Sequence, residues 1–453
     1  MKFGGTSIQG RRGVERVASI LSSGGPGTVA VVSAMAGTTD ALLEGAEAAV
    51  AGRPGLDQAA AAVREEHLRV AQDLLGEGEL DSFSAYLGAV ISRYRAYGAL
   101  LAGASSDARR SLEAASSAGE LLAAAILAAS LRGMGVSATA VDAARLLVTE
   151  GHPWAAEPLV QESGELARGE LLPLLRDGTL PVVTGFRAGT AAGQVTTLGR
   201  GGSDHTATVL GAVLAAAEIW IWTEVDGILT ADPRLVAESR LLPEVSYAEA
   251  IELSYFGAKV LHGRAVPPAA SAAIPIRIKN TMHPDRAGTV IEARRPGPGR
   301  VRAVTQMEQA CLLTMTASPG AGLNRLAGEV FSAFADARIT TLMVTQSSAE
   351  QVICVAIPAV ELTAAREALL PARFLLAVDI KDQVSVVVVV GEAMRGTAGI
   401  AGAMFGALGE HGINVVAISQ GSSELAVAAV VKRQDVGDAV RALHRQFGLA
   451  GPG

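Results

Sequence analysis

Short apolar runs alternate with amphipathic stretches through the first two thirds of the chain. Four runs rich in valine, isoleucine and other apolar residues predict buried strands at residues 27–35, 180–186, 218–225 and 274–280. Alanine-rich stretches at 40–75 and 83–103 place apolar residues three and four positions apart, which predicts helices. Strands that alternate with helices favour an α/β fold, with a mainly parallel sheet in the middle of three layers.

A different organisation follows the segment "ARRPGPGR" (293–300), whose prolines, glycines and arginines predict a linker. The stretch "RITTLMVTQSSAEQVICVAI" begins at Arg338, and "GINVVAISQGSSELAVAAVV" begins 74 residues later at Gly412. Polar positions recur at this offset, so that Gln346 corresponds to Gln420. We therefore predict two copies of one small α+β module, each built as strand, turn, helix, strand, turn and strand.

Composition excludes several classes of protein. The chain has 453 residues, which predicts two or three domains, and 49% hydrophobic against 18% charged residues, which argues against disorder. A net charge of −7 without basic runs argues against nucleic-acid binding. Two cysteines form no metal framework and favour a reducing compartment. We see neither a secretory pattern nor an apolar run of membrane-spanning length, so we expect a cytoplasmic protein that binds no membrane.

The chain opens on "MKFGGTSIQG", in which Lys2 precedes a Gly-Gly-Thr-Ser turn and a predicted helix. Such a turn offers backbone N–H groups and the positive end of a helix dipole to a phosphate, and the lysine adds a charge. Because the lysine comes before the glycines, the order differs from that of a P-loop. On its own, the stretch is equally compatible with a plain turn.

Three further segments combine glycine with charged residues. "GRGGSD" (199–204) precedes a long apolar helix, and an arginine between glycines is well suited to hold a carboxylate. "WTEVDGILTADPR" (222–234) joins a strand end to a tight turn, and "ELSYFGAKVLHGRAV" (252–266) predicts a helix that carries Lys259. Neither a Ser-His-Asp array nor the spacing of a zinc site is present, and we predict no metal-ligating residues in the protein.

Together these segments resemble the motifs of the amino-acid kinase family, and within it those of the aspartate kinases. The stretches "KFGGTS", "GRGGSD", "DGILTADPR" and "SYFGAKVLH" carry the resemblance, and the paired C-terminal modules resemble the regulatory ACT domains of these enzymes. The resemblance covers essentially the whole chain. It implies a kinase domain over residues 1–293 and two ferredoxin-like ACT domains over 302–380 and 381–453, with the last strand completing the first ACT domain.

The resemblance also implies a reaction. An aspartate kinase transfers the γ-phosphoryl of ATP, accompanied by Mg²⁺, to the β-carboxylate of L-aspartate, which gives 4-phospho-L-aspartate in the first step of lysine, threonine and methionine biosynthesis. A carboxylate is already ionised at pH 7, so no general base is required. Catalysis then rests on positioning and on positive charge.

Site residues follow from the resemblance position by position. Lys2 and Asp204 are the expected catalytic pair, in which the aspartate orients the lysine. Substrate binding is expected from Arg200, which clamps a carboxylate, from Glu120, which pairs with the α-ammonium, and from two hydrogen-bonding hydroxyls, Ser203 and Thr39. The expected nucleotide-binding residues are Gly4, Gly5, Thr223, Glu224, Leu229, Arg234 and Lys259.

The chain departs from the family pattern at several positions. Glu224 stands where aspartate is usual, Leu229 where tyrosine is usual, and Gly263 where proline is usual, and the change at Leu229 removes an aromatic ring from the nucleoside pocket. Relatives carry several apolar residues before the lysine, whereas here only Met1 precedes it. We expect the true start to lie upstream, because a missing buried strand leaves backbone groups unpaired.

The twin modules predict regulation by an amino acid. Gln346, Gln420 and Asn414 are the candidate effector contacts, and Asn414 corresponds to Thr340 in the first copy, so the two modules are not equivalent. Resemblance to threonine-sensitive members favours threonine as the inhibitor and lysine as the second choice. ACT pairing implies a homodimer or a larger homo-oligomer.

Three rival interpretations stay open from the sequence. The chain could phosphorylate glutamate, carbamate or a nucleotide instead of aspartate. It could be a non-catalytic amino-acid sensor with an inactive kinase domain, although Lys2, Lys259, Arg200 and Asp204 are all present. It could also be an aspartate kinase of a secondary pathway that lacks feedback control.

Overall fold

The structure is a computed structural model that describes residues 1–101, 108–150, 156–257, 260–293 and 301–450. The predicted linker at 293–300 therefore lies almost wholly outside the described residues. The chain forms two compact units, one of Met1–Gly227 with Val260–Ala293 and one of Ile228–Lys259 with Arg294–Gly453. The second unit thus holds a segment that the sequence places within the kinase domain.

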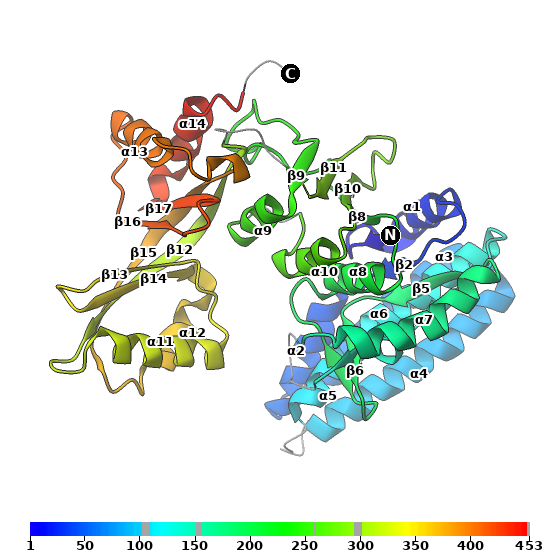
Figure 1. The fold of residues 1–453 in the computed structure, drawn as a ribbon. Coiled ribbons are helices and arrows are strands. Elements are labelled where there is room, and N and C mark those ends of the chain that lie inside the picture. Colours follow the sequence, from blue (N-terminus) through cyan, green and yellow to red (C-terminus); the bar gives the residue numbers. More distant parts are fainter. Residues whose placement is uncertain (102–107, 151–155, 258–259, 294–300, 451–453) are drawn as a thin grey trace. The chain divides into compact units, whose positions relative to one another are not determined.

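A mainly parallel sheet forms the centre of the first unit (Figure 1). Its strands in this unit lie in the order β3-β5-β2-β1-β8-β10-β11, and only β10 and β11 pair antiparallel. Their bounds are β1 Lys2–Phe3, β2 Ala30–Val32, β3 Ala138–Val141, β5 Leu180–Thr184, β8 Ile219–Thr223, β10 Ile276–Asn280 and β11 Thr289–Glu292. A separate sheet joins β4 (Val148–Thr149), β6 (Arg187–Thr190) and β7 (Val195–Thr197).

Helices cover both faces of this sheet. The helices of the unit are α1 Gly10–Ser22, α2 Thr38–Val50, α3 Leu56–Leu74, α4 Glu77–Leu101, α5 Ala108–Ser116, α6 Ala118–Gly133, α7 Val160–Arg176, α8 Gly202–Val213 and α10 Val266–Ser271. One face carries α6 with α1, and α3 and α4 pack outside them, whereas α8 covers the other face with α7 and α10. The expected three-layer α/β fold is confirmed.

Strand alternation decides which residues face which layer. Phe3, Val32 and Trp222 point into the core on the α6 side, where the rings of Phe3 and Trp222 stack 5.9 Å apart. Val31 and Ile221, at the alternate positions, are buried but lie outside that core cluster. The short β1 is therefore a central strand, paired with β2 and β8 and buried between the helical layers.

Two predicted helical stretches differ in extent from the structure. The stretch 40–75 is two helices, because "GRPG" at 52–55 interrupts the pattern with a proline and two glycines. The stretch 83–103 begins earlier, at Glu77 of α4. Among the described residues, one helical stretch, Leu112–Gly133, has the length and hydropathy of a membrane span, but 94% of its apolar window is buried inside the protein, as in a core helix.

The second unit is built around two long antiparallel strands, β12 (Ala303–Ala317) and β15 (Leu375–Val390). They lie at the centre of a sheet ordered β13-β14-β12-β15-β17-β16. The other strands are β13 Met343–Ser347, β14 Val352–Pro358, β16 Ala417–Gln420 and β17 Ala426–Lys432, and the helices are α11 Leu323–Ala337, α12 Leu362–Leu369, α13 Ile400–Glu410 and α14 Val436–Gln446.

Both repeats contribute to this sheet with the same register. Gln346 of β13 pairs with Ile353, and Gln420 of β16 pairs with Val427, so the 74-residue offset holds at both ends of each pair. The expectation that the last strand completes the first module is wrong. Within the described residues α14 is the last element, and residues 303–307 of β12 instead pair with the β15 segment that adjoins β17.

The segment after Gly227 packs on the second module inside the second unit. It includes β9 (Glu244–Ser246) and α9 (Tyr247–Tyr255). Glu249 closes a capping box with Ser246 and also accepts a hydrogen bond from the backbone N–H of Glu392 at 2.9 Å. Thr230 Oγ1 lies 3.0 Å from Nε2 of the buried His444 in α14. These buried contacts explain why this segment belongs to the second unit.

Candidate functional site

Candidate site residues of the first unit gather at the carboxyl ends of neighbouring parallel strands. Gly4 and Gly5 follow β1, Thr39 lies in the first turn of α2, which follows the loop after β2, and Thr223 closes β8. Open parallel sheets bind ligands at this edge, because backbone and helix N-termini converge there. The sheet thus brings together segments that are far apart in the sequence.

The glycine turn lies against the loop that follows β2. A Cβ atom on Gly5 would stand 2.6 Å from the carbonyl oxygen of Ala34, so this position has no room for a side chain. The backbone N–H of Ala36 donates to the carbonyl of Gly5 at 3.3 Å. Helix α1 begins at Gly10, after the glycine turn and the residues that follow it.

Lys2 and Asp204 form an ion pair at this edge. Nζ of Lys2 lies 2.6 Å from Oδ1 of Asp204, and both side chains are 12% exposed. Asp204 stands in the first turn of α8, and the backbone N–H of His262 approaches its Oδ2 at 3.5 Å. A Cβ on Gly4 would lie 3.7 Å from the Lys2 ammonium, which therefore sits above the glycine turn.

The segment 199–204 forms a tight loop before α8. Gly201, the N-cap of α8, has a φ of 74°, a conformation that favours glycine. Arg200 is exposed and forms no ion pair among the described residues, so its guanidinium is available to a ligand carboxylate. Ser203 packs against the turn after β5, because a Cβ on Gly185 would stand 2.4 Å from its Oγ.

Glu120 is buried in the first turn of α6. Its Oε1 accepts a hydrogen bond from the backbone N–H of Ala34 at 3.2 Å, and its Oε2 is buried without a hydrogen-bond partner among the described residues. Burial raises the pKa of Glu120 to about 7. Buried polar atoms are nearly always satisfied, so an unpartnered carboxylate oxygen beside the β2 loop is suited to a ligand's ammonium group.

A buried arginine that sequence reasoning missed supports the start of α6. Arg187 donates from Nε and Nη2 to both oxygens of Asp142 at 2.9 and 3.0 Å, and from Nη1 to Oγ and the carbonyl of Ser117 at 2.5 and 3.2 Å. Burial raises the pKa of Asp142, but hydrogen bonds and charge from Arg187 outweigh burial, so the pKa lies below its usual range. The available signal was a lone arginine in the apolar run "VVTGFRAG".

The expected nucleotide-binding residues divide between the two units. Thr223 and the exposed Glu224 belong to the first unit, where the carbonyl of Thr223 accepts from Thr281 at 2.9 Å. Leu229 and Arg234 belong to the second unit, in which Arg234 is paired with Asp232 at 2.6 Å. Lys259 lies outside the described residues.

The three candidate effector contacts lie in the second unit. Gln346 and Gln420 occupy the two outer strands of its sheet, and Asn414 precedes β16. Thr340, the counterpart of Asn414, donates from its backbone N–H and Oγ1 to Glu361 at 2.6 and 3.0 Å. The first module thus supplies its own carboxylate at this position.

No group of three or more histidine, cysteine, aspartate or glutamate side chains among the described residues has the geometry of a metal site. An ion carried by nucleotide phosphates needs only one or two protein carboxylates. A Mg²⁺ ion that arrives with the nucleotide therefore needs no separate metal site in the protein.

Comparison with known proteins agrees with this geometry. Residues 1–280 match the model of the amino acid kinase family, and residues 321–371 and 387–447 match an ACT domain model. The chain belongs to the amino acid kinase family. The candidate site lies within the range that matches this model, and the residues that match the ACT domain follow it in the sequence.

Members of the family with similar sequences are aspartokinases. The bifunctional aspartokinase/homoserine dehydrogenase 2 of Arabidopsis thaliana is 33% identical over 480 residues, which cover 100% of this chain and 52% of that protein. Aspartokinase 3 of the same plant is 31% identical over 99% of this chain and 81% of its own length. The chain spans about half the length of the first of these relatives.

A solved structure of the family also matches the whole chain. Escherichia coli aspartokinase III in complex with aspartate and ADP has a TM-score of 0.83 at 28% identity and covers 98% of both chains. The same enzyme in complex with lysine and aspartate has a TM-score of 0.80 at 29% identity.

Proposed function

We propose that this chain is an aspartate kinase that transfers the γ-phosphoryl of ATP, bound as its Mg²⁺ complex, to the β-carboxylate of L-aspartate. The product is 4-phospho-L-aspartate, the first intermediate on the way to lysine, threonine and methionine. Similarity to aspartokinases over essentially the whole chain supports the substrate class.

The observation that carries the proposal is the grouping of opposite charges at one sheet edge. The Lys2–Asp204 pair offers an ammonium held in place above the glycine turn. Glu120 presents an unpartnered carboxylate oxygen beside the β2 loop, and Arg200 presents a guanidinium. A ligand with one ammonium and two carboxylates, together with a phosphate, satisfies this set of charges.

The chemistry requires only these groups. The β-carboxylate of aspartate attacks the γ-phosphorus, the bond to the bridging oxygen of ADP breaks, and its electron pair leaves with ADP. Because the nucleophile is ionised at neutral pH, no side chain needs to accept a proton. Lys2 and the backbone N–H groups of the glycine turn stabilise charge on the transferring group.

Trapping of the acyl phosphate with hydroxylamine tests the proposal. Purified protein with Mg-ATP and L-aspartate is expected to form aspartyl hydroxamate, and glutamate in place of aspartate is expected to form little. A folded protein that binds aspartate but forms no hydroxamate would contradict the proposal and favour the non-catalytic sensor.

The ACT modules are proposed to bind an amino-acid effector in a homodimer or larger homo-oligomer. Recurrence of the glutamines at matched register in both modules supports a repeated ligand contact. Threonine is the first candidate, and lysine, which is bound in one structure of the E. coli relative, is the second. The same assay with each amino acid distinguishes them, and sedimentation measures the assembly. Insensitivity to both would indicate an enzyme without feedback control.

A further inference from the structure

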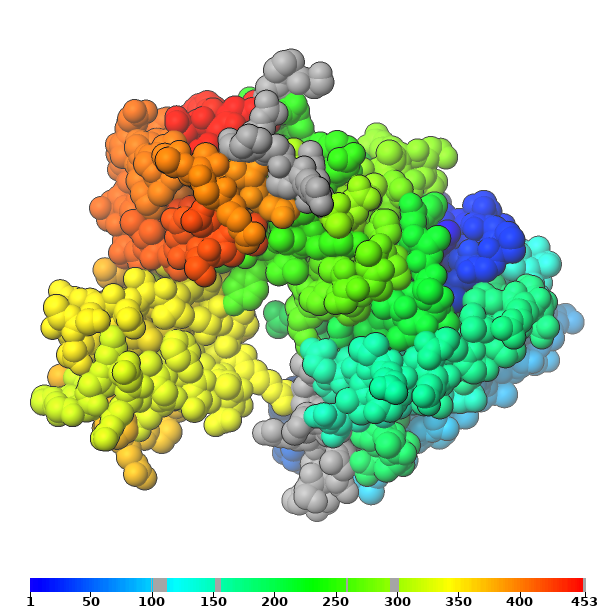
Figure 2. All heavy atoms as spheres, viewed as in Figure 1, coloured from blue at the N-terminus to red at the C-terminus, as the bar shows by residue number. Residues whose placement is uncertain are grey.

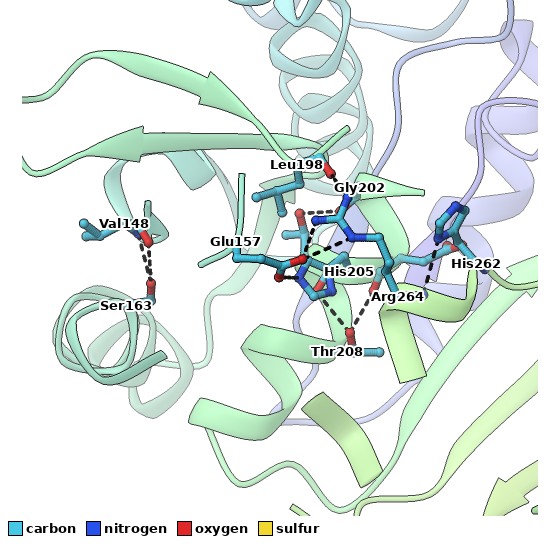
Figure 3. Close-up of polar contacts among 11 residues, drawn as sticks. Val148, Glu157, Ser163, Leu198, Gly202, His205, Thr208, His262 and Arg264 are labelled. Carbon is cyan, nitrogen blue, oxygen red and sulfur yellow. Dashed lines mark hydrogen bonds and ion pairs between the residues drawn. The ribbon is translucent and has the colours of Figure 1, made fainter. Parts of the chain in front are cut away.

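Three charged or titratable side chains outside the predicted site form one cluster in the first unit (Figure 3). Glu157 accepts hydrogen bonds from Nε of Arg264 at 3.1 Å and from its Nη2, and it lies 3.2 Å from Nε2 of His205. Burial lowers the pKa of His205, so the ring is neutral at pH 7 and donates to Glu157 through Nε2–H. Glu157 thus links two segments that are distant in sequence.

Each end of the cluster adjoins the loop 199–204. Nη1 of Arg264 donates to the carbonyl of Leu198, the residue immediately before that loop, at 3.3 Å. His205 directly follows Asp204 in α8. The guanidinium of Arg264 therefore connects Leu198, just before the loop, to Glu157. Glu157 in turn contacts His205, just after the loop, as Figure 3 shows.

The backbone that carries Arg264 also touches the loop. The N–H of Arg264 approaches Nδ1 of His262 at 3.4 Å, and the N–H of His262 approaches Asp204 at 3.5 Å. A Cβ on Gly201 would stand 2.3 Å from Cβ of His262, so loop and backbone are in close contact at that point. A shift of the 262–264 segment must consequently move Gly201 or Asp204.

We propose that Glu157 and Arg264 are positioning residues that hold the loop 199–204 in the geometry in which Arg200 and Asp204 act. The proposal rests on the aspartate kinase function only for its kinetic consequence. Neither residue is among the expected substrate contacts, and their hydrogen bonds reach Leu198 and His205 on either side of the loop, so both act through the loop.

The exposure of Glu157 indicates that its pair with Arg264 orients the loop and adds little to the free energy of unfolding. Its side chain is 67% exposed and lines a cavity of about 680 Å³ between α7, α8 and α10. The atoms of α7 lie at the surface of the unit in Figure 2. Exposed ion pairs contribute little to unfolding free energy, whereas two hydrogen bonds from a planar guanidinium fix an orientation. Loss of the pair should therefore affect loop mobility and ligand affinity more than melting temperature.

Hydrogen–deuterium exchange of the full chain tests whether Glu157 and Arg264 hold the loop 199–204, without reference to activity. Glu157→Gln and Arg264→Met are expected to speed exchange about tenfold in peptides that cover residues 199–206, while peptides from α6 stay unchanged. Glu162→Gln is the matched control, because Glu162 lies on the neighbouring α7 and is exposed. Unchanged exchange at 199–206 in both variants would overturn the proposal.

Kinetics with the same variants test the consequence. Each is expected to raise the KM for aspartate about tenfold and to leave the KM for Mg-ATP within twofold, because the loop carries Arg200. The double variant should be no worse than the worse single variant, since both break one link. Equal losses for both substrates with a lowered melting temperature would indicate a folding defect and overturn the proposal. If the wild-type protein makes no hydroxamate but both variants exchange faster than wild type at 199–206, the kinase function is refuted and the positioning role of Glu157 and Arg264 stands.

Discussion

The ammonium of Lys2 and the carboxylate of Asp204 lie 2.6 Å apart, and they join the first strand of the sheet to the first turn of α8. The two residues are separated by most of the kinase sequence, yet both side chains are largely shielded from solvent. Shielding strengthens the interaction and fixes the ammonium before any ligand arrives.

Lys2→Met is expected to lower kcat by about 100- to 1000-fold, because a preorganised positive charge is lost at the transferring phosphate. The KM for aspartate should change little. Hydroxamate formation measures the effect, with Lys381→Met, at an exposed position in the second unit, as the control. A kcat within a factor of three of wild type would show that Lys2 does not serve the transfer.

Glu120 should make both stability and aspartate affinity depend on pH. Its pKa is raised from 4.5 to about 7 by burial, so the folded protein keeps a proton that the unfolded chain has released in this interval. The free energy of unfolding therefore falls as pH rises from 4.5 to 7, by about 3 kcal/mol for this group. Urea unfolding measures the free energy of unfolding of wild type and of Glu120→Gln. The wild-type value should fall further below that of the variant as pH rises, and a difference that stays constant with pH would refute this prediction.

The raised pKa of Glu120 also predicts that kcat/KM for aspartate falls on the acidic side of its pH profile. Only ionised Glu120 attracts the α-ammonium, so kcat/KM for aspartate should rise as pH increases through about 7 in the wild-type protein. Glu120→Gln should lose this pH dependence and raise the KM for aspartate at pH 8.

Arg187 should set the pH at which kcat/KM for aspartate rises, because its positive charge lowers the pKa of Glu120. Arg187→Met combined with Asp142→Asn removes both charges, so that no buried carboxylate is left without its partner. The rise of kcat/KM for aspartate is expected to move to higher pH. Arg145→Met, which removes an exposed arginine paired with Glu170, should leave the profile in place. An unshifted rise in the double variant would limit Arg187 to a structural role.

The glutamines of the two modules should differ in their effect on regulation. Gln420→Ala is expected to weaken inhibition by threonine at least fivefold, because its module keeps Asn414 available. Gln346→Ala should have less effect, because Glu361 occupies the backbone N–H and hydroxyl of Thr340 in that module. Inhibition curves at fixed aspartate measure both variants. Equal sensitivity of the two would contradict this assignment.

Local pattern was sufficient for much of the architecture. Apolar runs located β2, β5, β8 and β10, because a buried strand must be apolar along its length. The 74-residue repeat gave two modules of the same topology, since equivalent residues form equivalent strand pairs. Helix limits were less accurate around 52–55, where the interruption depends on a few turn residues.

The environment of single side chains was not visible in the pattern. Glu120 looks like a solvated helix residue in sequence, yet α6 is enclosed by the sheet and by α4, which buries it. Arg187 and Asp142 are distant in sequence and meet only because β6 and the segment after β3 adjoin in the fold. Burial and long-range pairing depend on the whole chain, so neither could be read locally.

The sequence by itself therefore determined the alternation of strands and helices and the duplicated modules, because these follow from periodicity and repetition, and its motifs of adjacent residues carried the resemblance that named the candidate site. The family resemblance also implied that Asp204 orients Lys2, and the structure places the two side chains in contact. Only the tertiary structure decided that one oxygen of Glu120 is left for a ligand and that β12 is shared by both modules. Strand pairing and burial arise from contacts between distant segments, and the free energy of those contacts is set by the packed fold.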